Sequence, residues 1–97
     1  MAKEPDRNSW NSPLDPVVVT TERVVSGKSQ VLLVIHEEGH GGWQLHDGSD
    51  VSNQKPLILP KVEAVRLDAT LQEVTDLPVG WKAERTRKGA AWVRKPL

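Results

Sequence analysis

The chain has 97 residues, a length that suits one domain with a thin core. Its 13 basic and 13 acidic residues cancel to a formal net charge of zero, which argues against a nucleic-acid-binding protein and against a membrane-surface protein. The absence of cysteine excludes disulfides and thiol catalysis. No apolar run is long enough to span a bilayer and the polar N-terminus does not resemble a secretory signal, so we expect a cytoplasmic protein.

Residues 1–16 are predicted to form a flexible N-terminal arm, followed by a single domain over residues 17–97. Prolines lie among asparagines and serines in this segment, and no apolar periodicity is present. Trp10 is the one aromatic residue there. We expect it to pack loosely onto the domain.

Valine-rich segments predict strands in the first half of the domain. Residues 17–25 are dense in valine and threonine, and residues 30–36 are apolar enough for a buried strand. The loop between them is short and contains Gly27, so we expect these two strands to form a hairpin. After a turn over residues 37–42, apolar and polar residues alternate at 43–46, which predicts a third strand.

The second half of the chain predicts short helices followed by a second hairpin. Residues 49–55 are predicted to be a loop, and Pro60 suits the first position of a helix. Thr70 and Glu73 have the spacing of a capping box, which predicts another helical turn. Two further strands, at residues 79–85 and 91–93, are predicted to flank a turn that contains a glycine.

Together these elements predict an α+β domain. We expect the order strand-strand-strand-helix-strand-strand, with an antiparallel sheet of about five strands and one or two short helices on one face. An edge strand such as residues 17–25 would offer a route to a homodimer.

The sharpest catalytic motif is His36-Glu37-Glu38-Gly39-His40, which fits H-E-x-x-H, with His46 six residues later. In zinc hydrolases of this type two histidines on one helix bind the metal and the glutamate is the general base. The alternative function is therefore a zinc-dependent hydrolase that uses His36, His40 and His46 as ligands and Glu37 as base. It requires a helix through residues 29–40.

The surrounding residues argue against that alternative. The apolar run before His36 favours a strand. In the longer zinc-hydrolase motif a glycine lies three residues before the third histidine, and here that position is Trp43. The methionine turn of such enzymes is also missing, since the only methionine is Met1. In a strand-turn-strand arrangement His36 and His46 would face each other across a hairpin, with His40 at its tip, and bind metal weakly at most. We therefore expect no catalytic residue and no cofactor.

Three segments over about residues 17–95 contain, in order, a His-acidic-Gly turn before Trp-Gln, a Leu-Pro-x-Gly-Trp motif, and Ala-Glu-Arg followed by a final Trp-x-Arg. With these motifs the chain resembles a family of small uncharacterised bacterial proteins. The pattern is similar, more distantly, to immunity domains that neutralise a toxin by binding it. This resemblance implies a binding function and supplies no catalytic residues.

The sequence thus favours a non-enzymatic protein-binding module, of the immunity type where the resemblance is followed. Tryptophan and arginine anchor many interfaces. The predicted contact residues are Trp43, Trp81, Arg85, Trp92 and Arg94. The four tryptophans are the only aromatic residues of the chain, so each is expected to lie in the core rather than at an interface.

Overall fold

The computed structural model describes Trp10 and residues 17–38, 42–49 and 54–97. Its elements are β1 (Val17–Thr21), α1 (Glu22–Val25), β2 (Leu33–His36), β3 (Trp43–His46), β4 (Pro56–Pro60), α2 (Lys61–Leu67), the 3-10 helix η1 (Ala69–Val74), β5 (Trp81–Glu84) and β6 (Val93–Pro96). The strands form one sheet in the order β4-β1-β3-β2-β5-β6, and its pairs are antiparallel except β1 with β3. The predicted α+β class is confirmed, with six strands where about five were expected.

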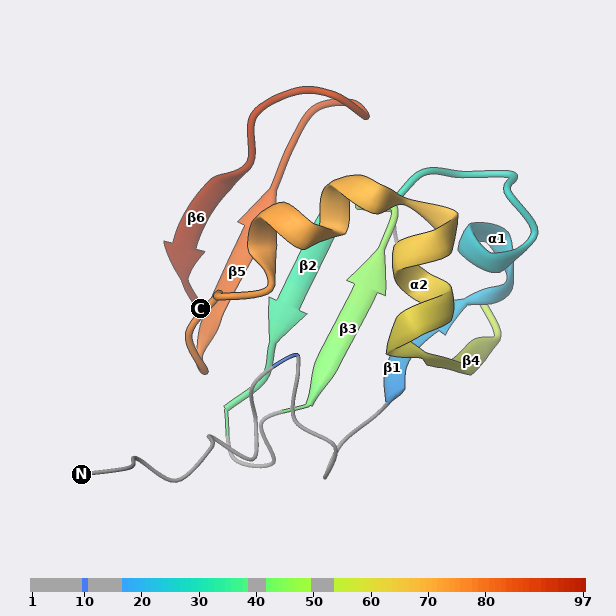
Figure 1. Ribbon diagram of the computed structural model, residues 1–97, viewed down its shortest axis with the longest axis horizontal. Coiled ribbons are helices and arrows are strands. Elements are labelled where there is room, and N and C mark those ends of the chain that lie inside the picture. Colours follow the sequence, from blue (N-terminus) through green and yellow to red (C-terminus); the bar gives the residue numbers. More distant parts are fainter. Residues whose placement is uncertain (1–9, 11–16, 39–41, 50–53) are drawn as a thin grey trace.

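The longer helical segments cover one face of the sheet, which we call the inner face. Figure 1 shows α2 and η1 lying across this face, with α1 close to the end of β1. Successive side chains of a strand point to opposite faces, so alternate strand residues meet the helices. The resulting core includes Val18, Val34, Trp43, Leu45, Ala64, Leu71, Val74, Leu77 and Ala83. Burying one leucine or valine contributes about 1.5–3 kcal/mol.

The predicted hairpin between residues 17–25 and 30–36 is wrong. The first strand ends at Thr21, and residues 22–25 form α1 instead of continuing it. Thr21 and Val24 are both buried, and their spacing of three residues suits a helical turn. The connection is then too long for a tight hairpin, and β3 lies between β1 and β2 through the parallel pair Val19 with Gln44. The hairpins β2–β3 and β5–β6 are formed as predicted.

Strand β4 was not predicted. The sequence Pro-Leu-Ile-Leu-Pro pairs with β1 along its whole length, from Val17 with Pro60 to Thr21 with Pro56. Proline is tolerated here because β4 lies at an edge of the sheet. Pro60 therefore ends a strand and precedes α2, rather than taking the first helical position. Part of the predicted loop, residues 50–53, lies outside the described residues.

The start of η1 also differs from the predicted capping box of Thr70 and Glu73. The N-cap residue is Asp68, whose side chain accepts a hydrogen bond from the Thr70 backbone N–H at 3.0 Å. Aspartate is a strong N-cap because its carboxylate satisfies an N–H that has no partner within the helix. Thr70 lies inside η1, and its hydroxyl donates to the same carboxylate.

Asp68 also takes part in a buried ion pair with Arg85, which follows β5. The Arg85 Nη2 lies 2.7 Å from Asp68 Oδ2, and both side chains are almost inaccessible to solvent. Two further N–H groups of Arg85 reach the Val31 carbonyl oxygen, and Nη1 donates to Thr70. The Trp92 ring lies 4.0 Å from the guanidinium carbon. Arg85 thus joins the sheet, the segment before β2 and the start of η1.

Trp10 belongs to the core instead of packing loosely. Its side chain is buried, and its ring meets Trp43 edge-on with 5.1 Å between ring centroids. The Lys61 ammonium lies 5.7 Å from the centre of the Trp10 ring. The rest of the predicted arm, residues 1–9 and 11–16, lies outside the described residues. In the described part of the chain, no helix is long and apolar enough to cross a membrane.

We expect Arg85→Met to lower the free energy of unfolding by about 3–5 kcal/mol, because it leaves a buried carboxylate without its partner. Arg94→Met is the control, since Arg94 pairs with the exposed Asp76 and such pairs contribute at most about 1 kcal/mol. Urea unfolding followed by tryptophan fluorescence measures both. An equal decrease in the free energy of unfolding in the two variants would show that the buried Arg85–Asp68 pair stabilises the fold no more than an exposed pair.

The stability should also fall in acid through Asp68. Burial raises the pKa of Asp68, but the hydrogen bonds from Thr70 and Arg85 and the Arg85 charge together bring it below the ordinary value. A carboxylate with a lowered folded-state pKa stabilises the protein above the unfolded value of about 3.9, and the effect is lost as the pH falls toward the folded-state value. A ¹³C NMR titration should give an Asp68 midpoint below that of an unfolded peptide. A midpoint above it would contradict the pairing.

Candidate functional site

The structure separates His36 from His46, two of the three histidines that the zinc alternative requires. His36 pairs with Trp43 and His46 pairs with Leu33, so the two histidines lie at opposite ends of the β2–β3 hairpin. His36 points to the inner face, where its ring stacks on Trp43 at 3.9 Å and its Nδ1–H donates to the Leu77 carbonyl oxygen at 2.7 Å. His46 lies on the opposite face, which we call the outer face.

The expectation that His36 and His46 face each other is therefore wrong. His36 pairs with Trp43 and therefore shares its face of the sheet. His46 lies three residues after Trp43 on the same strand, and an odd spacing puts it on the opposite face. The helix that the zinc alternative requires is also replaced by β2. His40 lies outside the described residues, and within the described ranges no group of three histidine, cysteine or acidic residues is placed to hold a metal.

Glu37 takes part in a polar chain on the outer face instead of acting beside His36. Gln44 donates from its amide nitrogen to Glu37, and the His46 Nε2 lies 2.7 Å from the Gln44 amide oxygen, so Nε2–H is the donor. Burial lowers the pKa of His46 below its ordinary value, although the Asp47 and Glu37 charges act in the opposite direction. Burial thus favours the uncharged form of the His46 imidazole.

The predicted contact residues divide between the core and the surface. Trp43 is buried against Trp10 and His36, and Arg85 is enclosed by Asp68, Val31 and Trp92, so neither forms a surface anchor. The physical reason is that an aromatic-poor chain uses its tryptophans to fill the core.

The other predicted contact residues remain at least partly accessible. Trp81 and Trp92 are half-buried. Arg94 is exposed but occupied, since it reaches the Glu73 carbonyl oxygen at 2.8 Å and the Asp76 carboxylate at 2.7 Å. These contacts fasten β6 to η1. The structure therefore brings Arg85 and Trp92 together and leaves no single cluster of the five.

The outer face presents a row of side chains that the sequence reasoning missed. No helix of the described residues lies across this face (Figure 1). Direct cross-strand pairing places six residues side by side across the whole sheet, in the order Ile58, Val19, Gln44, Ile35, Lys82 and Lys95. The sequence Pro-Leu-Ile-Leu-Pro could have indicated an edge strand, but the pairing of Ile58 with Val19 comes from the tertiary structure. We call these six residues the outer row.

The outer row is apolar at one end and basic at the other. Ile58 is 73% exposed and its neighbour Val19 is 38% exposed. At the basic end the Lys95 ammonium lies 2.9 Å and the Lys82 ammonium 3.9 Å from Glu84, which leaves one positive charge in excess. The hydrogen bond from Lys95 and the charges of both lysines lower the pKa of Glu84. The two ends thus differ in chemistry.

Both sheet edges are protected against pairing with another strand. The predicted dimer edge, residues 17–25, lies inside the sheet, because β4 covers β1. In an antiparallel pair, residues that hydrogen-bond to the partner strand alternate with residues whose backbone N–H and C=O point away from it. The Glu22 N–H donates to the Lys55 carbonyl oxygen, so the backbone groups of Pro56, Ile58 and Pro60 point away from β1. Two of these three residues have no N–H. In β6 the outward positions are Arg94 and Pro96, by the same alternation.

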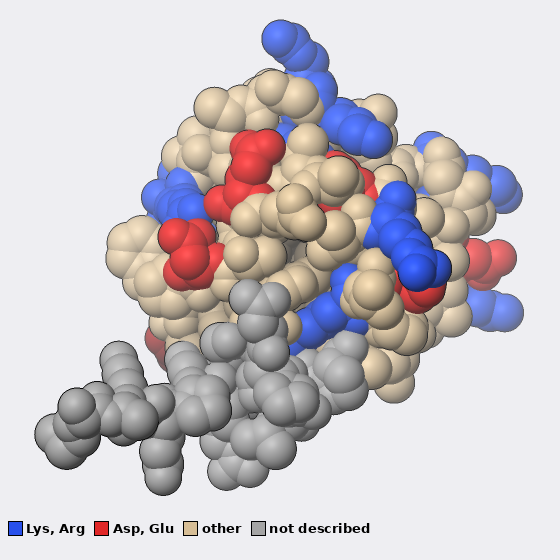
Figure 2. Space-filling view, in the orientation of Figure 1, with Lys and Arg blue, Asp and Glu red and all other residues tan. Residues whose placement is uncertain are grey.

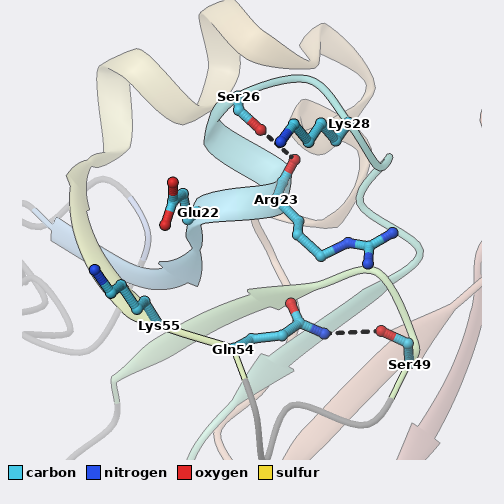
Figure 3. A pocket seen from close by; sticks show the side chains of 7 residues that line it. All are labelled: Glu22, Arg23, Ser26, Lys28, Ser49, Gln54 and Lys55. Carbon is cyan, nitrogen blue, oxygen red and sulfur yellow. Dashed lines mark hydrogen bonds between the residues drawn. The ribbon is translucent and has the colours of Figure 1, made fainter.

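Charges on the inner face are mixed. Figure 2 shows basic and acidic side chains interspersed over the helix side, without a continuous patch of one sign among the described residues. A hollow of about 650 Å³ lies elsewhere, beside α1. Figure 3 shows the seven residues that line it, which are Glu22, Arg23, Ser26, Lys28, Ser49, Gln54 and Lys55. The outer row and this hollow are both candidate functional surfaces.

The lowered pKa of His46 should appear in the pH dependence of stability. Because the unfolded imidazole takes up a proton near pH 6.5 and the folded one resists it, the free energy of unfolding should decrease as the pH falls below about 6.5. In His46→Gln this part of the dependence should disappear. Urea unfolding at several pH values between 8 and 5 measures the difference, and identical curves for the two proteins would contradict it.

Comparisons with known proteins add no family to these observations. No protein-family model, no curated protein and no solved structure matches the chain. The resemblance to small bacterial proteins and immunity domains therefore rests on the sequence motifs alone. A fold by itself does not specify a function.

Proposed function

We propose that this protein is a non-catalytic binding domain that docks another protein on its outer sheet face. The observation that carries the proposal is the pairing of Ile58 with Val19 at the exposed end of the outer row. Scattered exposed apolar residues are ordinary on proteins, but adjacent ones on an uncovered sheet face are typical of an interaction site. Covering the Ile58 side chain would contribute up to about 1.5–3 kcal/mol.

A different protein fits this face better than a second copy of the chain. With strands 4.8 Å apart and a rise of 3.3 Å per residue, six strands of four or five residues present roughly 400 Å², about half of the usual area per partner. A symmetric dimer would have to be built from this area alone, since both edges are protected. A larger partner can extend its contacts past the edge strand β4.

The charge pattern specifies the partner further. Its docking surface should have an apolar centre that meets Ile58 and Val19, and carboxylates on the side that meets Lys82 and Lys95. Complementary charges of this kind set orientation and speed association more than they add affinity. The polar chain through Gln44 contains two internal hydrogen bonds, which offset part of its desolvation when it is covered.

The resemblance to immunity domains suggests what such binding achieves. An immunity protein acts by covering a toxin, which needs a rigid complementary surface and no catalytic group. A sheet face meets this requirement because backbone pairing holds its side chains in fixed positions. We accordingly propose toxin neutralisation as the specific form of the binding function.

Ile58→Asp should abolish partner capture, whereas Val62→Asp should not. Val62 is the matched control because it is 61% exposed and lies on α2, across the sheet from the outer row. Tagged wild type and both variants are incubated with lysate of the native cells and the bound proteins are quantified by mass spectrometry. We expect one acidic-surfaced protein to be lost at least about tenfold with Ile58→Asp only.

Two further measurements decide the outcome. Lys82→Glu with Lys95→Glu should slow association and weaken its dependence on salt. If the captured protein stops growth when it is expressed, co-expression of the wild type should restore growth and Ile58→Asp should not. Equal capture by all variants, or a loss confined to Val62→Asp, would contradict the proposed docking face.

A further inference from the structure

A second hollow lies at the basic end of the outer row, on the hairpin that β5 and β6 form. Its volume of about 490 Å³ is within the usual range of ligand pockets. The residues that line it are Glu84, Arg85, Thr86, Ala91, Val93 and Lys95. The hollow is thus formed entirely within residues 84–95, which the structure describes without a gap.

Strand alternation puts this hollow on the outer face. Lys82 and Lys95 are neighbours in the outer row, and Glu84 and Val93, which pair with each other, lie two residues away on the same two strands. An even spacing keeps side chains on one face of the sheet, so all four point outward. Beyond Glu84 and Val93 the strands end, and Figure 1 shows the chain separating into a wide loop. The hollow therefore extends the outer face past the strand ends.

The walls of the hollow are mostly apolar and are held from the inner face. Val93 is 51% exposed, and Thr86 and Ala91 in the loop are exposed as well. Each of these two loop residues adjoins a residue with an inner-face contact, because the Trp92 ring lies 4.0 Å from the Arg85 guanidinium carbon. Arg85 is itself fixed by buried hydrogen bonds. The walls are consequently in place before a ligand arrives.

Two ammonium groups converge at the rim of this hollow. The Lys95 ammonium lies 2.9 Å from one carboxylate oxygen of Glu84, and the Lys82 ammonium lies 3.9 Å from the other. The longer distance is beyond a hydrogen bond, so Glu84 does not use the N–H groups of Lys82. With two cations around one carboxylate, an incoming carboxylate meets a net positive charge.

The hairpin as a whole has an excess of positive charge. Residues 81–97 contain six lysines and arginines and a single acidic side chain, Glu84. Two of these cations form ion pairs with aspartates outside the hairpin, whereas Arg87 and Lys88 have no ion pair with any described residue. Because the net charge of the chain is zero, this excess makes the hairpin the part that attracts an acidic partner.

We infer that the protein partner of the outer face inserts an apolar side chain from an acidic segment into this hollow, and that Lys82 and Lys95 bind the carboxylates beside that side chain. The inference rests on the proposed function, since it names the part of the partner that meets the basic end of the outer row. An apolar hollow alone would admit many ligands, but the converging ammonium groups at its rim favour one with a carboxylate next to its apolar group. The strands provide about half of the usual interface area, and the hollow adds contact beyond their ends.

Short peptides test the hollow separately from the whole partner. The ¹⁵N-labelled protein is titrated with acetyl-Asp-Glu-Leu-Glu-Asp-amide and with two control peptides, one with serine in place of leucine and one with lysine in place of the four acidic residues. We expect saturable shifts of the amides at 84, 86, 91, 93 and 95 with the first peptide, and a dissociation constant of about 1 mM or tighter at low salt. Both control peptides should bind at least about tenfold more weakly. Linear shifts with the first peptide, or equal binding of the serine peptide, would overturn the inference.

Charge variants test the role of the two ammonium groups. Lys82→Gln with Lys95→Gln should weaken peptide binding about tenfold, and Glu84→Gln should tighten it about threefold because no carboxylate of the protein then competes for the lysines. The matched control is Lys28→Gln with Lys55→Gln, which removes the same charge from two exposed lysines beside α1 (Figure 3) and should change the constant less than about twofold. Equal weakening by the control would show that only general charge attraction is at work.

Apolar variants distinguish this inference from the proposed function. Val93→Ser should weaken peptide binding about fivefold and Val62→Ser should not, and neither change opens the core because both side chains are more than half exposed. Ile58→Asp, at the other end of the outer row, should abolish partner capture but leave peptide binding unchanged. Capture that depends on Ile58 and not on Val93 would overturn the inference and leave the proposed function in place. Saturable binding of the acidic peptide without any Ile58-dependent capture would support the hollow as an acidic-peptide site and contradict the docking proposed for the outer row.

Discussion

The guanidinium of Arg85 is the contact on which most of the architecture depends. It lies between the end of β5, the Val31 carbonyl oxygen and the Asp68 carboxylate that caps η1. A buried charge of this kind costs several kcal/mol in desolvation and is tolerated here because all three nitrogens of the guanidinium donate hydrogen bonds. It therefore specifies one arrangement of η1 on the sheet, since any shift would leave ionised groups unpaired in the core. Trp92 completes the enclosure from the last loop.

Holding η1 and α2 against one side of the sheet has a consequence for the other side. A chain of this length can bury only a thin core, and here the helices are used on the inner face. The outer face is left with Ile58 and Val19 at one end and two lysines at the other. The same constraint that organises the core thus produces the surface from which the binding function is proposed.

The edges of the sheet explain why that surface would bind by its face. The outward positions of β4 are largely prolines, and those of β6 are an arginine and a proline, so neither edge offers a row of free N–H groups. Strand addition is thereby disfavoured, and contact through side chains remains. The polar chain of Glu37, Gln44 and His46 crosses this face with two internal hydrogen bonds. A partner therefore meets polar groups that are in part already paired.

The sequence by itself determined the α+β class, the strand at 43–46 and the final hairpin, because alternation and turn residues are local signals. Only the tertiary structure decided which strands are neighbours. Strand β1 pairs with β3 and not with β2, the next strand in the sequence, and Pro-Leu-Ile-Leu-Pro becomes an edge strand. The same pairing put His36 and His46 on opposite faces and buried Trp43 and Arg85. These outcomes depend on contacts between residues distant in the chain, since a register shifted by one residue reverses every face of a strand.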